Sequence, residues 1–422
     1  MKKLFTLFLA LALLFLTACN TATPPAGTLA SDSLDNTQES NPNKESENVI
    51  SILKSNGSMI NLPSRIIFED TVDGLTRTYY YSKVDGNAYV YCFDPLCDHT
   101  DYTCFGNPNA YHSGWNFSST FFINNRFYSV TAYGQIWSFA VDGSDKRIEY
   151  DAGYELTDTV ITNIWSTPPL IYGQYIYIIL KADETGNPHN LRYNIETKEM
   201  EDLTNKTGNF ISPQYIYNGI IYGMGDARKM GDTYLKADLD MNTVEINENF
   251  TSANYAVNNL IVGKVWESRE SIFELPKLLG IKIFDVKTEK YIQITNAELG
   301  VESVEIAGMT NQYIYFYDNK IVNLGTMIVN VGGTDKEMTV QKMNNGKLYR
   351  MNLDGTNIIC VYDNSDYELS SNMAIYDDKI VMQGQYVSFE NNTEKIWGGP
   401  IQVATINPDG TFGEFVAVEV LQ

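Results

Sequence analysis

The chain of 422 residues has little of what several functions require. It has 30 basic residues against 52 acidic ones, a formal net charge of −22, and no basic run. This balance argues against nucleic-acid binding and against electrostatic docking on anionic lipid. Three histidines are present, and both a Gly-x-Ser-x-Gly motif and a phosphate-binding glycine loop are missing. The sequence therefore identifies no catalytic residues.

Long apolar runs are also missing, except at the N-terminus. There Lys2 and Lys3 precede the segment Leu4–Leu16, which is apolar apart from Thr6 and is followed by Thr17-Ala18-Cys19. The segment is too short for a membrane-spanning helix, so it indicates a signal peptide. One interpretation is an ordinary secretory signal in which the cysteine is accidental.

Leu16-Thr17-Ala18-Cys19 resembles the bacterial lipobox. The resemblance implies a lipoprotein signal peptide over 1–18, cleavage before Cys19 and lipidation of its thiol. Residues 19–48 are rich in Thr, Ser, Asn, Pro and acidic side chains, so we expect a disordered tether. We expect residues 49–422 to form the folded domain, held through its lipid at the extracytoplasmic side of the cell membrane.

From residue 58 onward, apolar residues alternate with a period of two and the chain is rich in tyrosine, isoleucine and valine. Such residues favour strands, and no convincing helical period is found. We interpret four segments as opening strands of a repeated unit: Arg126–Val130, Tyr175–Ile179, Gly219–Tyr222 and Gln312–Phe316. Later strands end in Asp-Gly or Thr turns, as at Asp354-Gly355 and Thr288. Asp-Gly between alternating runs is typical of a hairpin.

Repetition of such units predicts an all-β fold, a β-propeller of seven blades with four antiparallel strands each. The alternative is a pair of stacked β-sandwiches. The blades are expected at about 77–104, 118–150, 170–204, 215–247, 258–296, 312–362 and 374–419. Leu324–Met343 is expected as an insertion in the sixth blade. Met59–Phe68 is expected to add a strand to the last blade and close the ring.

These turn and strand repeats resemble those of TolB-like and related bacterial surface propellers, over most of residues 77–419. The resemblance implies a fold and assigns no catalytic residue.

Three cysteines and a histidine cluster at Cys92, Cys97, His99 and Cys104. They could supply four zinc ligands, although the spacing is irregular. The alternative, which we favour, is a Cys97–Cys104 disulfide, which an extracytoplasmic location permits; free thiols are a third interpretation. Zinc is the one cofactor that the sequence raises. The separate Cys360 stands in an apolar strand and is expected to be a small core residue.

Candidate ligand-binding residues are Trp115, Trp165 and His112, which fall in expected loops. Exposed aromatic rings there would suit sugar or peptide stacking, whereas packing between blades is the alternative role. Trp137 is expected in the core and His189 in a loop. Asp238–Asn242 matches the start of a calcium loop but lacks its glycine and its final glutamate, so we expect a hairpin turn.

Two functions remain open from the sequence. The first is a surface-exposed binding or scaffolding lipoprotein, whose ligand is a glycan, peptide or protein partner. The second is an extracytoplasmic carbohydrate-active enzyme that uses paired carboxylates.

Overall fold

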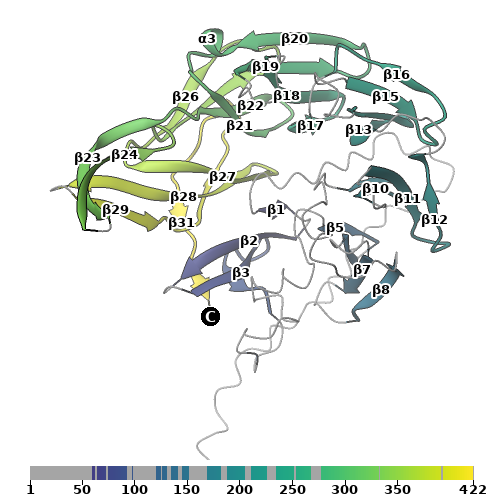
Figure 1. The fold of residues 1–422 in the computed structure, drawn as a ribbon, viewed down its shortest axis with the longest axis horizontal. Coiled ribbons are helices and arrows are strands. Elements are labelled where there is room, and N and C mark those ends of the chain that lie inside the picture. Colours follow the sequence, from purple (N-terminus) through teal and green to yellow (C-terminus); the bar gives the residue numbers. More distant parts are fainter. Residues whose placement is uncertain are drawn as a thin grey trace, which may run out of the picture. The chain divides into compact units, whose positions relative to one another are not determined.

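The computed structural model describes residues 59–61, 64–72, 75–92, 97, 120–124, 126–130, 135–140, 145–151, 169–181, 188–204, 211–225, 234–250, 253–267, 277–331, 333–390 and 393–421. In these ranges the chain is built of β-strands, and one short helix is present, α3 (Asn296–Leu299). Strands that follow one another in the sequence pair into small sheets, and these sheets follow one another along the chain (Figure 1).

Seven sheets form a seven-bladed β-propeller, which confirms the predicted fold. Blade 1 contains β1 (Ile60–Asn61), β2 (Arg65–Val72), β3 (Leu75–Ser82) and β4 (Ala88–Val90). Blade 2 contains β5 (Thr120–Ile123), β6 (Arg126–Val130), β7 (Gln135–Ala140) and β8 (Arg147–Asp151). Blade 3 contains β9 (Leu170–Tyr172), β10 (Tyr175–Lys181), β11 (Pro188–Asn194) and β12 (Met200–Asp202).

The next three blades follow the same order. Blade 4 contains β13 (Ser212–Tyr217), β14 (Ile220–Met224), β15 (Tyr234–Asp238) and β16 (Val244–Ile246). Blade 5 contains β17 (Tyr255–Val257), β18 (Leu260–Trp266), β19 (Leu278–Asp285) and β20 (Lys290–Thr295). Blade 6 contains β21 (Val304–Met309), β22 (Tyr313–Asp318), β25 (Lys347–Asn352) and β26 (Ile359–Asp363).

Blade 7 contains β27 (Tyr367–Tyr376), β28 (Lys379–Glu390), β30 (Gln402–Thr405) and β31 (Val416–Ala417). A further strand, β29 (Thr393–Gly398), pairs with the far end of β28. The insertion predicted in blade 6 is a separate two-stranded hairpin of β23 (Val322–Val331) and β24 (Thr334–Lys342). The last strand, β32 (Val420–Leu421), leaves blade 7 and joins blade 1.

The segments that we expected to open the repeats are second strands. They correspond to β6, β10, β14 and β22, and a first strand precedes each of them. The sequence misses first strands such as β9 because three residues are too few for an alternating pattern to stand out.

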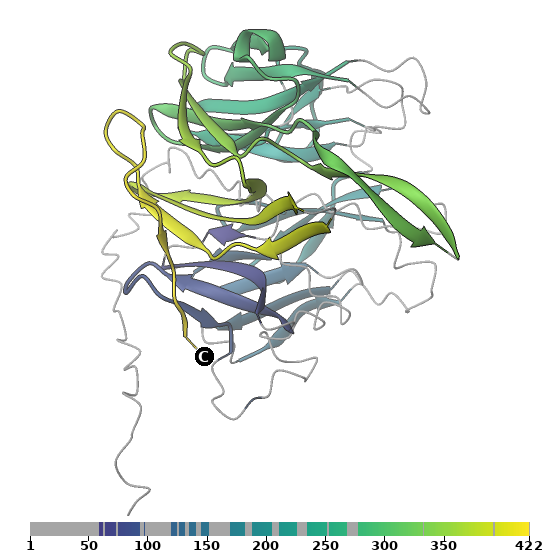
Figure 2. The same ribbon diagram turned by 90° about the vertical axis from the view of Figure 1, so that its left-hand side faces the viewer.

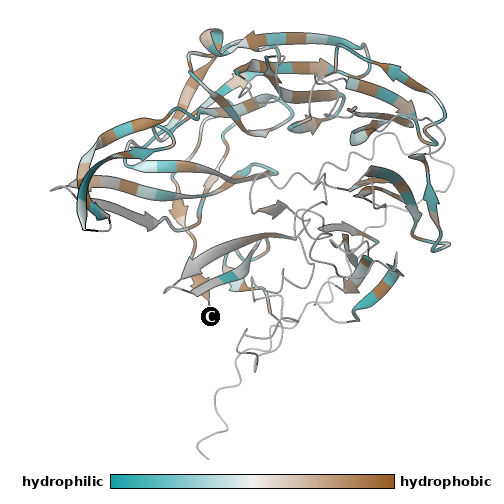
Figure 3. Cartoon of the chain, viewed as in Figure 1, coloured by the Kyte–Doolittle hydropathy of each residue, from teal (hydrophilic) through white to brown (hydrophobic). Residues whose placement is uncertain are grey.

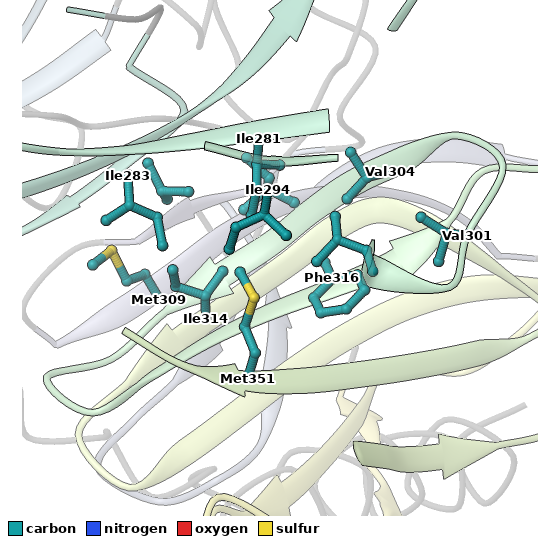
Figure 4. Packing of buried hydrophobic residues seen from close by; sticks show 12 residues of the cluster. Ile281, Ile283, Ile294, Val301, Val304, Met309, Ile314, Phe316 and Met351 are labelled. Carbon is teal, nitrogen blue, oxygen red and sulfur yellow. The ribbon is translucent and has the colours of Figure 1, made fainter. Parts of the chain in front are cut away.

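The hydrophobic core lies between blades. Separate clusters of buried residues join blades 2 and 3, 3 and 4, 4 and 5, 5 and 6, 6 and 7, and 7 and 1. Figure 4 shows the cluster between blades 5 and 6, where Ile283 meets Met309, Ile314 and Met351. The brown and teal bands of Figure 3 alternate along many of the described strands. Inner strands are buried on both faces, since a blade packs against a neighbour on each side.

Along the second strands β10 and β22, isoleucine faces the preceding blade of the ring and tyrosine faces the following one. In blade 3, Ile176 and Ile178 pack toward blade 2, whereas Tyr177 packs toward blade 4. In blade 6, Ile314 packs toward blade 5 and Tyr315 toward blade 7. One face of these second strands therefore meets the preceding blade with an aliphatic side chain, and the other meets the following blade with a phenol.

Phenols of inner strands, from the first strand β13 as well as from the second strands β10 and β22, donate a hydrogen bond to a backbone carbonyl of the following blade. The pairs are Tyr177 with Leu239 O (3.2 Å), Tyr215 with Asn258 O (3.0 Å) and Tyr315 with Gly410 O (3.1 Å). Burial raises the pKa of Tyr177 to about 12 and also raises the pKa of the other two. The hydroxyls therefore keep the proton that they donate.

The ring closes differently from our prediction. Met59–Phe68 was expected to join the last blade, but β1 and β2 pair within blade 1, where β2 and β3 form a tight hairpin from Val72 and Leu75. Pairing with an adjacent strand requires less loop closure than pairing across the ring. The strand exchanged between blades is instead β32, which runs parallel to β4.

Three side chains also differ from expectation. Cys360 lies in the outermost strand of blade 6 and is exposed, because that strand has no blade outside it to cover it. Trp137 lies in β7 as expected but is half-buried, with its Nε1 donating to Gln135 Oε1 at 2.9 Å. His189 lies in strand β11 and not in a loop, because the proline before it is the first residue of that strand.

Candidate functional site

The two faces of the propeller differ in their connections. We call the face where first strands turn into second strands, and third into fourth, the turn face. Most of its turns are short. Residues with positive φ occur in them at Gly173, Lys198, Asn218, Met241, Asn258, Glu289, Gly355, Asp377 and Gly410. Asp238 confirms the predicted hairpin turn, since its carboxylate accepts the backbone N–H groups of Asn242 (2.9 Å) and Thr243 (3.0 Å).

We call the opposite face the loop face. Second strands end there, third strands begin there, and the chain passes there from one blade to the next. The connections between β4 and β5, β8 and β9, β14 and β15, and β18 and β19 all start and finish at this face. Apart from the connection between β30 and β31, the turns of the turn face are all shorter than these four. Long connections on a rigid scaffold are where binding residues concentrate.

The candidates chosen from the sequence fall on loop-face connections. His112 and Trp115 stand between β4 and β5, and Trp165 stands between β8 and β9. All three lie outside the described residues, as does Cys19. Their roles stay predictions.

The cysteine cluster follows β4 at the loop face. Cys92 and Cys97 are half-buried, and Cys92 N–H donates to Val90 O at 2.7 Å. His99 and Cys104 lie outside the described residues. Within the described part of the chain, no three His, Cys, Asp or Glu side chains are grouped to hold a metal ion. The choice among disulfide, zinc and free thiols stays open.

The hairpin β23–β24 leaves blade 6 at the loop face and extends beyond the blades (green in Figure 2). Its outer part is open to solvent, with Ile328 72% and Met338 50% exposed. Gly325, in β23, approaches the ring of Phe389 on the extended end of β28 so closely that a Cβ there would lie 2.5 Å from it. The long strands of blades 6 and 7 thus support each other.

The root of this hairpin is locked to blade 7. Asn344 is fully buried, and its amide pairs with the backbone of Leu369, donating to the carbonyl (2.6 Å) and accepting from the N–H (3.0 Å). Lys342 is buried as well, and its Nζ donates to Ser365 O. Gly346 has φ +70° and lies against Asn364 O, which leaves no room for a side chain. The hairpin is therefore held in a defined direction.

Ionisable side chains lie near the loop-face ends of strands in blades 5, 6 and 7. Lys264, in β18, forms an ion pair with Glu305 at the start of β21, with Nζ 2.9 Å from Oε2 and each side chain 19% exposed. Trp266, two residues after Lys264, is 38% exposed, and Lys264 Nζ lies 5.6 Å from its ring centroid. An aromatic surface thus stands beside one donor group and one acceptor group.

A second group of ionisable side chains, Tyr317, Lys342 and Glu368, belongs to blades 6 and 7 and the hairpin β23–β24, and it includes the strand partner of Glu305. Tyr317 is the strand partner of Glu305 and is buried. Its pKa is raised, mainly by burial and further by the carboxylates of Glu305 and Glu368. The pKa of Lys342 is lowered by burial, which nearby Asp366 and Glu368 oppose. Carboxylates from two successive first strands therefore both disfavour ionisation of one phenol.

His189 forms a further polar contact at the loop-face end of blade 3. Its Nδ1 lies 2.9 Å from Asp202 Oδ2, and both side chains are partly exposed. The pKa of Asp202 is lowered by hydrogen bonds from His189 and Thr204, which outweigh its partial burial.

Sequence reasoning missed the group of Trp266, Lys264 and Glu305. Trp266 is one of five tryptophans in the chain and was not among the residues selected from the sequence. A signal was present in Lys264-Val265-Trp266, where alternation puts the lysine and the ring on one side of the strand.

Comparisons with known proteins give no family. No family model matches the chain, and no curated protein matches it. Solved structures that resemble it include an oligogalacturonate lyase from Vibrio parahaemolyticus (11% identity, 82% of this chain and 88% of that chain, TM-score 0.41). Others are the β-propeller domain of the Trilobed protease from Pyrococcus furiosus (15%, 69% and 90%, 0.35) and TolB from Acinetobacter baumannii (10%, 84% and 77%, 0.29).

The structural neighbours thus include TolB and other β-propeller proteins, and the likeness concerns the fold alone. In the described part of the chain, no helix is both long and apolar enough to cross a membrane.

Proposed function

We propose that this protein is a lipid-anchored, extracytoplasmic binding or scaffolding protein whose ligand docks on the loop face. The ligand is a glycan, a peptide or a partner protein. One observation carries the proposal: short turns predominate on the turn face, whereas four long connections start and finish at the loop face and the exposed hairpin β23–β24 leaves blade 6 there. The buried root at Asn344 supports it, because a fixed projection loses less entropy on binding than a mobile one.

Photo-crosslinking on whole cells tests which face binds. A crosslinking amino acid replaces Ile328 on the hairpin or Val84 in a turn of the turn face, and the two positions are 72% and 76% exposed. We expect adducts from position 328 and few from position 84. Equal adducts from both positions would count against a binding role for the loop face.

The lipid anchor is proposed from Leu16-Thr17-Ala18-Cys19. Cys19→Ala should release the protein from the membrane fraction without changing the folded domain, because the lipid is the proposed anchor. The Cys360→Ala variant is the control, since it removes an exposed cysteine of the propeller. Recovery of the Cys19→Ala protein in the membrane pellet would refute lipid anchoring.

A second candidate function is cleavage of an extracellular polysaccharide. The observation in its favour is that the pKa of the Tyr317 phenol is raised mainly by burial and further by Glu305, its strand partner, and by Glu368, on the first strand of the next blade. Paired carboxylates are the usual catalysts of glycoside hydrolysis. Hydrolysis of a polysaccharide by the wild type that is lost in both Glu305→Gln and Glu368→Gln would favour this function over simple binding.

A further inference from the structure

Two large aromatic side chains are exposed in the described part of the chain, and both belong to blade 5. Trp266 is 38% exposed and Tyr291 is 47% exposed. Each has a lysine over its ring, Lys264 at 5.6 Å and Lys282 at 4.5 Å. Trp266 ends β18 at the loop face, whereas Tyr291 lies near the start of β20, toward the turn face. Comparing substitutions of the two residues therefore shows whether ligand binding depends on the face on which an aromatic ring lies or only on its being exposed.

The surroundings of Trp266 differ from those of Tyr291 in one respect. Lys264 is held by Glu305 of the neighbouring blade, so the ammonium group near the indole is itself bound to a carboxylate. Lys282, in contrast, meets a backbone carbonyl, that of Glu248, at 3.5 Å. A carboxylate accepts hydrogen bonds, and an ammonium group donates them.

This combination matches the chemistry of a sugar ring. Adjacent hydroxyls of a sugar can accept from an ammonium and donate to a carboxylate at the same time, and charge-assisted hydrogen bonds are stronger than neutral ones. An exposed indole offers a flat apolar surface for the C–H face of the ring. We propose that Trp266, Lys264 and Glu305 form a saccharide-binding site, which rests on the proposed binding role of the loop face and specifies its ligand class.

The charges favour a neutral saccharide over an acidic one. The chain carries a formal net charge of −22, and a further carboxylate, Glu368, stands on the first strand of blade 7. Lys264 is already paired with Glu305, so it adds no net positive charge to the site. A uronate would approach a negative field, which weakens binding and slows association.

Isothermal titration of the wild-type protein tests the proposal. The probes are neutral tetrasaccharides of glucose, mannose, xylose and N-acetylglucosamine, together with an oligo-uronate of equal length. We expect at least one neutral tetrasaccharide to bind, and the oligo-uronate to bind more weakly. Trp266→Ala should weaken binding by about tenfold or more, and Trp266→Phe should weaken it less, because a smaller stacking surface remains. Tyr291→Ala, the control, should stay within about twofold.

Three outcomes overturn the proposal: no neutral tetrasaccharide binds, the oligo-uronate binds best, or Tyr291→Ala weakens binding as much as Trp266→Ala. Circular dichroism of each variant shows that the sheets are intact. If no saccharide binds while crosslinks still form from position 328, the ligand class is wrong and the binding role of the loop face stands. If neither is seen, both proposals fail.

Discussion

The phenol of Tyr315 gives a sharp test of how the blades are joined. Tyr315 is fully buried, and its hydroxyl donates to Gly410 O, in a turn of the next blade, at 3.1 Å. Tyr315→Phe keeps the ring stacked on Phe412, at 5.3 Å between centroids, and removes the donor. We expect a loss of about 1 kcal/mol in the free energy of unfolding, and up to about 3 kcal/mol if the carbonyl is left without a partner.

Tyr313→Phe is the matched control, because Tyr313 lies on the same strand and donates to Pro408 O in the same turn. That hydrogen bond is exposed, so water replaces the lost donor and the change should stay within about 0.5 kcal/mol. Urea unfolding followed by tryptophan fluorescence and circular dichroism gives both values. Equal losses in the two variants, or no loss in Tyr315→Phe, would refute the view that buried phenols join the blades.

Three further predictions concern the closure of the ring, its pH dependence and the cysteines. Deleting residues 418–422 removes β32 and its backbone hydrogen bonds to blades 1 and 7. The free energy of unfolding, measured in urea, should therefore fall by about 2–4 kcal/mol. An unchanged urea midpoint would mean that β32 does not close the ring. Burial lowers the pKa of Lys83 to about 8, from 10.5 when unfolded, so the folded state binds this proton more weakly. Stability should therefore rise between these pH values, and Lys83→Met should remove that rise in urea titrations at several pH values. Thiol counting on unfolded protein that starts after Cys19, with a chelator present, should find two free thiols if a Cys97–Cys104 disulfide exists and four if it does not.

The sequence predicted the repeated blades better than the way in which the first and last blades are connected. Alternation in second strands such as Tyr175–Lys181 is strong because both faces are buried, so the number of blades was correct. The closing strand Val420–Leu421 has two residues, which is too short for any pattern, and Met59–Phe68 carries no sign of which blade it joins. Burial was also misjudged for Cys360, since apolar neighbours do not reveal that a strand is outermost.

The sequence could predict which face of the propeller carries the candidate site, but not which residues form it. Long connections between short strands indicate where binding residues gather, and His112, Trp115 and Trp165 were chosen on that basis. The pairing of Lys264 with Glu305 joins two blades, so it depends on how the blades pack, which alternation along one strand cannot tell.

The position of β32 has a consequence for how the chain matures. Its partner β4 is about 330 residues earlier, so the outer backbone groups of β4 have no partner until the last part of the polypeptide has been delivered. As the chain is synthesised, blade 1 would be available first and would wait with an open edge that other chains could join. Such a chain benefits from a holding chaperone at its point of release, and its slowest folding step should be the capture of its own tail.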